Sequence, residues 1–155
     1  MPVILRRAVE ADAGELLTLQ RAAYVTTAQL YRDPFLPPLL ETLDGVAEAI
    51  RSQVVLAAVD GHRIVGSARC RVEGSVGHLG RLVVAPDRSG ARLGVRLVKA
   101  IQEHAPPSVT RFELFTGALS ERHIALYWIL GFEEFDRRFS DEGLELVYMA
   151  RERDA

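Results

Sequence analysis

Residues 82–98 read LVVAPDRSGARLGVRLV. A short β-branched run ends at Pro86, passes through a basic turn that contains Gly90, and opens into an apolar helix. A helix start presents free backbone N–H groups, and the helix dipole and nearby arginines add positive charge. This stretch therefore predicts an anion-binding turn at the end of a buried strand, where the anion usually belongs to a cofactor.

Length and composition are typical of a single globular domain, here residues 1–155, with 48% hydrophobic and 26% charged residues. The formal net charge of -2 gives no reason to expect nucleic acid or an anionic membrane as the main partner. Residues 1–7 are too short for the apolar part of a signal peptide, and no apolar run reaches membrane-spanning length. We therefore expect a cytoplasmic enzyme or binding domain.

Cysteine and histidine give little sign of redox or metal chemistry. Cys70 is the sole cysteine, which excludes an internal disulfide, and its alternating strand-like context favours a buried hydrophobe over a nucleophile. The four histidines, His62, His78, His104 and His123, have no spacing typical of a metal site, and we expect no metal.

The remaining patterns predict an α/β domain with a mixed central sheet of about seven strands and about four helices. Alternating apolar residues indicate strands over 3–7, 54–60, 63–73, 78–84, 110–116, 132–139 and 144–150. Helical periodicity indicates helices over 12–24, 44–52, from the basic turn to about 103, and 120–130. The strand–helix–strand unit between residues 78 and 116 requires a parallel pair in the sheet.

Local signals add detail at the ends of these elements. Asp12 and Glu15 resemble a capping box, Ser120 is expected to cap the last helix, and Gly131 to end it. Three prolines interrupt residues 31–38, so the segment 25–40 is expected to be a long irregular loop.

The element order and two sequence blocks resemble the GNAT superfamily of acetyl-CoA-dependent N-acetyltransferases. Family members have a strand that ends in Val-x-Pro, followed by Gln/Arg-x-x-Gly-x-Gly/Ala, and this signature falls here on Ser89, Arg92 and Gly94. The second block, residues 120–132, is similar to the family's ending Tyr-x-x-x-Gly-Phe, with Tyr127 as its tyrosine. The resemblance covers residues 54–139 and implies the single-domain GNAT fold, with a splayed parallel pair.

The chain departs from the family signature at two positions. Ser89 replaces the first Gln or Arg, and Arg92 replaces the middle glycine, which lets the backbone approach the pyrophosphate. Arg92 can keep helical dihedrals and add a cation, and Arg88 can replace the arginine missing at position 89. His123 stands where the family usually has Asn. These departures leave open an alternative, a catalytically inactive acyl-CoA-binding or sensor domain. A third reading is a relative in fold alone.

The resemblance also implies where acetyl-CoA binds. Its pantetheine arm would lie between the splayed strands and pair with the backbones of Leu82, Val83 and Val84, and an N–H near Val83 would polarise the thioester oxygen. Tyr127 would point at the CoA sulfur and protonate the departing thiolate. The other expected cofactor-binding residues are Arg88, Ser89, Gly90, Ala91, Arg92, Leu93, Gly94 and His123.

The acceptor amine needs a group that removes its proton, because amines like that of lysine have a pKa of about 10.4. His78 lies on the same strand face as Leu82, where some relatives carry a glutamate base, and imidazole suits this task. The alternative is a polar residue that merely begins the strand. Glu113 is a weaker candidate base.

The segment 25–40 corresponds to a loop that helps form the acceptor pocket in the family. Candidate lining residues are Tyr31, Asp33 and Phe35, and Asp33 would favour a cationic amine; the alternative is that they are ordinary surface residues.

The expected reaction is direct transfer of acetyl from acetyl-CoA to a primary amine of a small molecule or peptide, in a ternary complex. Many family members are dimers, so a homodimer is an option, although no sequence patch identifies its interface.

Overall fold

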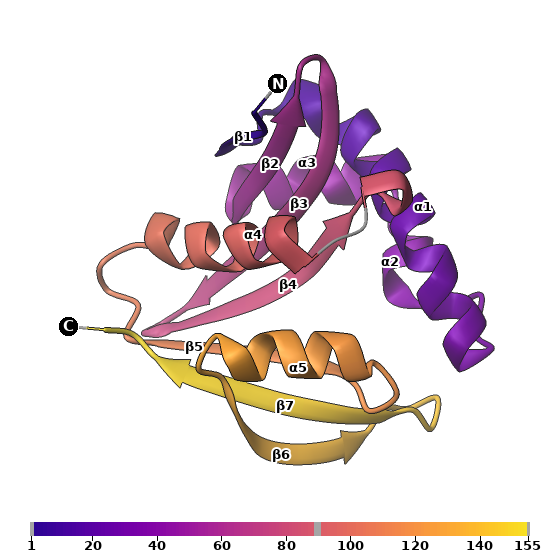
Figure 1. Ribbon diagram of the computed structural model, residues 1–155, viewed down its shortest axis with the longest axis vertical. Helices are drawn as coiled ribbons and strands as arrows, with labels where there is room; N and C mark the ends of the chain where they lie inside the picture. The colour runs from indigo at the N-terminus through magenta and orange to yellow at the C-terminus, as the bar shows by residue number, and fades with distance from the viewer. Residues whose placement is uncertain (1, 89–90, 155) are drawn as a thin grey trace.

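The computed structural model describes residues 2–88 and 91–154, with the backbone alone at Ala91. Over these residues the chain forms one seven-stranded sheet in the order β1-β2-β3-β4-β5-β7-β6 (Figure 1). Neighbouring strands are antiparallel except β4 and β5, the parallel pair expected from the sequence. The strands are β1 (Ile4–Arg7), β2 (Val54–Asp60), β3 (Arg63–Glu73), β4 (Val76–Val84), β5 (Arg111–Gly117), β6 (Glu133–Phe139) and β7 (Glu145–Glu152).

Helices cover both faces of the sheet (Figure 1). One face carries α4 (Ala91–His104) and α5 (Glu121–Ile129), and the other carries α1 (Ala13–Tyr31), α2 (Pro37–Leu40) and α3 (Leu43–Ser52). The core fills the two layers between helices and sheet, and its largest fully buried side chains include Leu56, Leu97, Ile101, Phe112 and Phe132. No helix in the described part of the chain is both long and apolar enough to cross a membrane.

Helix α4 shows why this sequence packs as it does. Leu97, Val98 and Ile101 are buried, as the 3.6-residue period requires for one face of a helix. The carboxyl end of α4 is capped from outside the helix, because the Arg153 guanidinium donates hydrogen bonds to Gln102 O and to three carbonyls that follow, those of Ala105, Pro106 and Val109. This cap ties α4 to the end of the chain beyond β7.

The parallel pair separates soon after it forms. β4 and β5 are paired only at three rungs, from Val76–Arg111 to His78–Glu113, although β4 continues to Val84 and β5 to Gly117. The two strands therefore enclose a wedge that opens toward their carboxyl ends, which confirms the splayed pair expected from the sequence.

Three local predictions were wrong. Helix α1 runs to Tyr31 instead of ending at residue 24, and Arg32 closes it in the left-handed conformation at φ 53°. The Asp12–Glu15 capping box does not form, because Asp12 accepts hydrogen bonds from Val9 N–H and Arg6, and Glu15 accepts one from Ile64 N–H. Tertiary partners thus replace the local ones that the pattern suggested.

The third wrong prediction is the Ser120 cap. The Ser120 side chain makes no capping hydrogen bond, and its hydroxyl lies 2.8 Å from the Tyr31 hydroxyl instead. By contrast, Gly131 adopts a positive φ of 93°, as the predicted helix end requires, and Gly61 has φ 63° in the turn between β2 and β3.

Candidate active site

The open edge of β4 forms one wall of the wedge. Ala85 donates its N–H to Val65 O in β3, and Val83 is paired with Ser67 of the same strand. Backbone groups alternate between the two edges of a strand, so those of Leu82 and Val84 face the wedge. The amides nearest Val83 that can reach a ligand there are therefore those of its two neighbours.

A β-bulge precedes this edge. Between the rungs Ser67–Val83 and Arg69–Gly80, β4 has one residue more than β3. Arg81 occupies the bulge with φ 50°, a left-handed conformation that few non-glycine residues adopt. The bulge changes the direction of the Arg81 side chain just before the strand reaches the wedge wall. The prediction that His78 and Leu82 share a strand face is wrong, because the extra residue puts His78 on the face of Val83 instead.

Two tyrosines from opposite layers approach each other at the wedge. Tyr127 of α5 is buried, with its ring 5.9 Å from that of Phe132 and 6.3 Å from that of His123. Burial raises the pKa of Tyr127, and the proximity of Tyr24 of α1 raises it further. The Tyr127 phenol is thus a proton donor over the whole neutral range. His123 of the same helix is exposed on one side, but partial desolvation lowers its pKa, which favours the neutral form.

A polar cluster lies on the α1 side of the wedge; it consists of Gln20, Tyr24, Glu41, Arg69 and Arg81. Arg69 is buried and holds Glu41 with two hydrogen bonds, of 2.9 and 2.7 Å, and Gln20 donates a third of 2.9 Å. Burial alone would raise the pKa of Glu41, but these hydrogen bonds and the two arginine charges outweigh it and lower the pKa to about 2. Glu41 is therefore a firmly ionised carboxylate.

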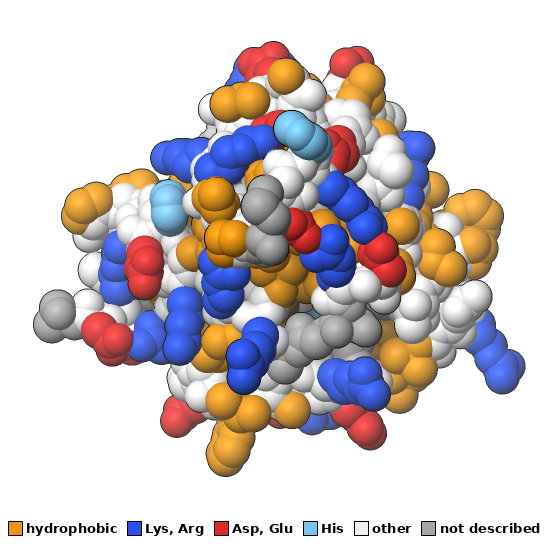
Figure 2. All heavy atoms as spheres, turned by 45° about the horizontal axis from the view of Figure 1, so that its top comes forward, with side chains coloured by type: hydrophobic (Ala, Val, Ile, Leu, Met, Phe, Trp, Pro, Cys, Tyr) orange, Lys and Arg blue, Asp and Glu red, His pale blue; other side chains and the backbone are white. Residues whose placement is uncertain are grey.

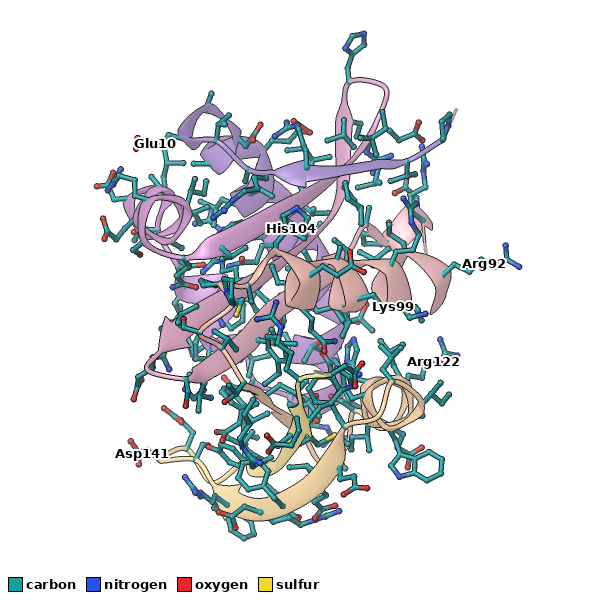
Figure 3. All side chains as sticks on the ribbon, turned by 90° about the vertical axis from the view of Figure 1, so that its left-hand side faces the viewer. Glu10, Arg92, Lys99, His104, Arg122 and Asp141 are labelled. Atoms are coloured by element: carbon teal, nitrogen blue, oxygen red, sulfur yellow. The ribbon has the colours of Figure 1, made fainter. Side chains whose placement is uncertain are left out.

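Basic side chains gather on the face that α4 and α5 cover (Figure 2). Arg92 and Lys99 project from α4, and Arg122 projects from α5 on the same side of the molecule (Figure 3). Gly94 is buried where the two helices meet, and a Cβ there would make an ordinary contact of 3.5 Å with Leu126. This face offers an anion both cationic side chains and the amino end of α4.

The expected cofactor residues of the basic turn differ in what the structure describes. Ser89 and Gly90 lie outside the described residues. Arg92 has ordinary helical structure in the first turn of α4, so the arginine at this position does not disrupt the helix. The Arg88 guanidinium forms an ion pair with Asp60 at the end of β2, so any phosphate it binds has to share it with that carboxylate.

The two candidate bases lie at the closed end of the wedge. His78 and Glu113 face each other on the last paired rung of β4 and β5. Glu113 accepts a 2.8 Å hydrogen bond from Arg111 Nε, whereas His78 is half-buried and stands opposite Arg71 of β3. Of the two, His78 is the side chain without a described hydrogen bond.

Of the three acceptor-pocket candidates, Tyr31 and Asp33 already form hydrogen bonds within the protein. The Tyr31 hydroxyl lies 2.8 Å from Ser120 Oγ and accepts a hydrogen bond from Leu119 N–H, so it joins α1 to the segment before α5. Asp33 accepts a 2.8 Å hydrogen bond from Phe35 N–H and so shapes the turn after α1. Phe35 itself is 71% exposed.

Sequence reasoning missed the polar cluster altogether. Glu41 and Arg69 are far apart in the chain, and no motif connects them. The signal that could have found Arg81 is a lone arginine in this strand, directly before the apolar run of residues 82–85. Cys70 has the buried place expected of it, and burial raises the pKa of its thiol to about 11, which makes it a poor nucleophile.

The comparisons with known proteins agree with this geometry. A family model of the acetyltransferase (GNAT) domain matches residues 35–153. The chain belongs to the GNAT family of acetyltransferases, and it is therefore an acyltransferase. No functionally curated sequence matches it significantly.

Solved structures match over nearly the whole chain. A putative acetyltransferase from Salmonella typhimurium, with its cofactor acetyl-CoA, is 16% identical with a TM-score of 0.79, covering 100% of this chain and 96% of that one. A ribosomal-protein-alanine N-acetyltransferase from Brucella melitensis is 24% identical with a TM-score of 0.78, covering 97% and 99%. A GNAT acetyltransferase from Streptococcus pneumoniae is 18% identical with a TM-score of 0.77, covering 98% and 100%. These likenesses confirm the fold.

Proposed function

We propose that this protein transfers an acetyl group from acetyl-CoA directly to a primary amine of a small molecule or peptide, within a ternary complex. The observation that carries the proposal is the wedge between β4 and β5, with Tyr127 buried beside it in a chain of the GNAT family. Support for the cofactor comes from the similar Salmonella protein, whose structure contains acetyl-CoA.

The residues present fit acetyl-CoA. The backbone groups of Leu82 and Val84 turn toward the wedge, where they can pair with an extended amide-bearing arm. The first turn of α4, with Leu93 and Gly94 after the expected Ser89–Ala91 turn, offers N–H groups to a pyrophosphate, and Arg92 adds a cation. Acetyl-CoA supplies the activated acetyl thioester and a thiolate leaving group.

Side chains of this protein are proposed to take the proton from the amine and to supply one to the thiolate. Deprotonating a lysine-like amine at pH 7 costs about 4–5 kcal/mol, so a base that takes the proton, directly or through water, increases the rate. We assign the role of this base to His78. We assign to the Tyr127 phenol the role of donating a proton to the CoA thiolate. His123 beside Tyr127 completes this side of the site.

We assign the acceptor side to Tyr31, at the end of α1, and to Asp33 and Phe35, which follow it; Tyr31 contacts Ser120, the residue before α5. In this assignment the Asp33 carboxylate favours an acceptor with a cationic amine. We further propose a cytoplasmic location, and a homodimer as the assembly to test.

One experiment tests the proposal. The purified protein is mixed with acetyl-CoA and a panel of amines while free thiol is measured, and thermal unfolding is followed with and without CoA. Stabilisation by CoA and thiol release with at least one amine are expected; saturation at 100 times Kd adds about 2.7 kcal/mol of stability. Stabilisation without turnover on any amine indicates the sensor domain instead. Absence of stabilisation contradicts both.

A matched pair of variants locates the CoA site. Arg92→Ala removes a cation from the first turn of α4, and Arg51→Ala removes an exposed cation from α3 on the opposite face. We expect Arg92→Ala alone to weaken CoA binding, measured as the ligand concentration that gives half-maximal stabilisation. Equal effects of both variants would mean that CoA does not contact this turn.

A further inference from the structure

The bulge in β4 carries the Arg81 side chain into the polar cluster. Its Nε atom lies 3.6 Å from Glu41 Oε1, and its charge is close enough to act on the Tyr24 phenol. Since Glu41 is bonded to Gln20 of α1, Arg81 is on the α1 side of the sheet. Arg92, Lys99 and Arg122 project from the helices of the other face (Figure 3). The phosphates of a CoA molecule bound on that face are not partners of Arg81.

Arg81 is a cation without a full set of partners. Both oxygens of Glu41 already accept hydrogen bonds from Arg69, and one accepts another from Gln20. Arg81 Nε is buried without a hydrogen bond to any described residue, and 3.6 Å is too long for one. Since Arg69 and Glu41 neutralise each other, the cluster as a whole has one positive charge in excess.

The backbone at Arg81 supports a functional interpretation. A left-handed φ of 50° is unfavourable for an arginine, and such strain persists mainly at sites where function requires it. Bulges next to active sites often redirect a side chain. Here the redirected guanidinium lies one residue before Leu82, whose backbone faces the wedge in which the proposed acetyl transfer takes place.

Resting on that proposed function, we propose that Arg81 binds a carboxylate of the acceptor, so that the preferred substrates are amines that also carry a carboxylate. The planar fork of an arginine matches a carboxylate in geometry. A single carboxylate also balances the single excess charge of the cluster, whereas a phosphate dianion would overcompensate it. Free amino acids, and peptides with an acidic residue beside the N-terminus, both provide this chemistry.

Two variants isolate the guanidinium from the fold. Arg81→Asn removes the cation, and asparagine tolerates the left-handed conformation better than most residues. Glu41 keeps its bonds from Arg69 and Gln20, so the cluster is not left with an unpaired carboxylate. Arg81→Lys keeps the charge but loses the fork. Arg71→Gln is the matched control, because it removes an exposed arginine that is paired with Glu73 on β3.

The test measures thiol release with pairs of acceptors that differ only in a carboxylate. One arm compares free amino acids with their carboxamides, and the other compares short peptides that have Asp or Glu after the first residue with their Asn or Gln counterparts. In at least one arm we expect the acid to exceed its amide by tenfold or more in kcat/KM. Arg81→Asn should reduce this ratio to within about twofold of unity, Arg81→Lys to an intermediate value, and Arg71→Gln should preserve it.

Failure of this inference differs from failure of the proposed function. If amines are acetylated but amides serve as well as acids, or if Arg71→Gln lowers the ratio as much as Arg81→Asn, the role of Arg81 is wrong and the enzymatic activity stands.

A binding experiment needs no turnover: the same acids and amides are added with CoA, and thermal unfolding is followed. Acids that raise Tm more than amides in wild type, but not in Arg81→Asn, support the inference even without thiol release. Equal shifts overturn it.

Discussion

At the scale of single residues, Tyr127 is a buried phenol whose surroundings keep it protonated. Its ring packs against Phe132 and His123, and burial and the nearby Tyr24 keep its phenol protonated. A buried phenol that stays protonated is suited to donate a proton to a leaving group rather than to accept one. In the proposed function this phenol serves the gap between β4 and β5 from α5.

Removing the Tyr127 hydroxyl should therefore affect chemistry more than binding. Tyr127→Phe keeps the ring contacts, so we expect half-maximal stabilisation by CoA at nearly the wild-type concentration. Turnover should fall by about 10²–10⁴-fold, the usual contribution of general acid catalysis. Thiol-release kinetics with a saturating acceptor measure the loss of turnover. Thermal unfolding at several CoA concentrations measures the retained CoA binding. Unchanged turnover would remove Tyr127 from the mechanism.

At the scale of elements, the end of α1 is joined to the segment before α5. The Tyr31 hydroxyl meets Ser120 Oγ and Leu119 N–H, and it lies so close to Gly117 that no side chain fits there. Tyr24 and Tyr127 belong to the two helices that this contact connects. The link thus helps set the distance between the two layers at the open end of the wedge.

Gly117→Ala should break this link. A Cβ at residue 117 would overlap the Tyr31 hydroxyl, so Tyr31 must move and lose both hydrogen bonds, at a cost of about 1–3 kcal/mol. Urea unfolding measures this loss, and the KM for the acceptor should rise more than that for acetyl-CoA. Gly14→Ala is the matched control, because its Cβ meets nothing within 4 Å and should stabilise α1 by about 0.5–1 kcal/mol.

A double-mutant cycle checks the cause. If Gly117→Ala acts through the Tyr31 hydroxyl, its effect should be smaller when Tyr31→Phe has already removed that group. Additive losses of the two changes would show that the alanine disturbs something other than the link.

These elements also show how far sequence reasoning reaches. The strand–turn–helix of residues 82–98 was predictable because Pro86, the basic turn and the apolar period are local signals. The end of α1 was not, because prolines at 34, 37 and 38 suggested a loop from residue 25, whereas the helix continues to Tyr31 before the first of them. The apolar run in α5 predicts a buried Trp128, yet this side chain is 69% exposed, since only part of α5 faces the sheet.

The candidate site likewise has a part that local sequence predicts and a part that it does not. The wedge and Tyr127 follow from motifs and element order, whereas the cluster around Arg81 depends on contacts across long stretches of chain. A one-residue bulge decides where the Arg81 side chain points, and no pattern of period 2 reveals it. Partners such as Glu41 and Arg69, which lie on separate elements, become visible only once the sheet is folded.

At the scale of the whole molecule, Glu41 connects parts of the fold that are distant in sequence. It follows α2, accepts hydrogen bonds from Gln20 of α1 and Arg69 of β3, and lies beside the bulge of β4. Because it is mostly buried, losing its charge would leave Arg69 without a counter-ion inside the protein. The stability of the entire domain should therefore depend on the ionisation of this carboxylate.

The pKa of Glu41 is about 2 in the folded protein, below its ordinary value of 4.5, so the folded state favours the charged form. This contribution to stability is fully present above about pH 4.5 and is lost as the pH falls toward 2; its size is on the order of 3 kcal/mol. Glu41→Gln should lower the free energy of unfolding by about that amount at pH 7, and the gap to wild type should narrow between pH 4.5 and 3. Urea unfolding at several pH values measures the gap, with Glu73→Gln, at an exposed ion pair, expected to differ little from wild type. A gap that stays constant from pH 7 to 3 would mean that the charge of Glu41 does not stabilise the fold.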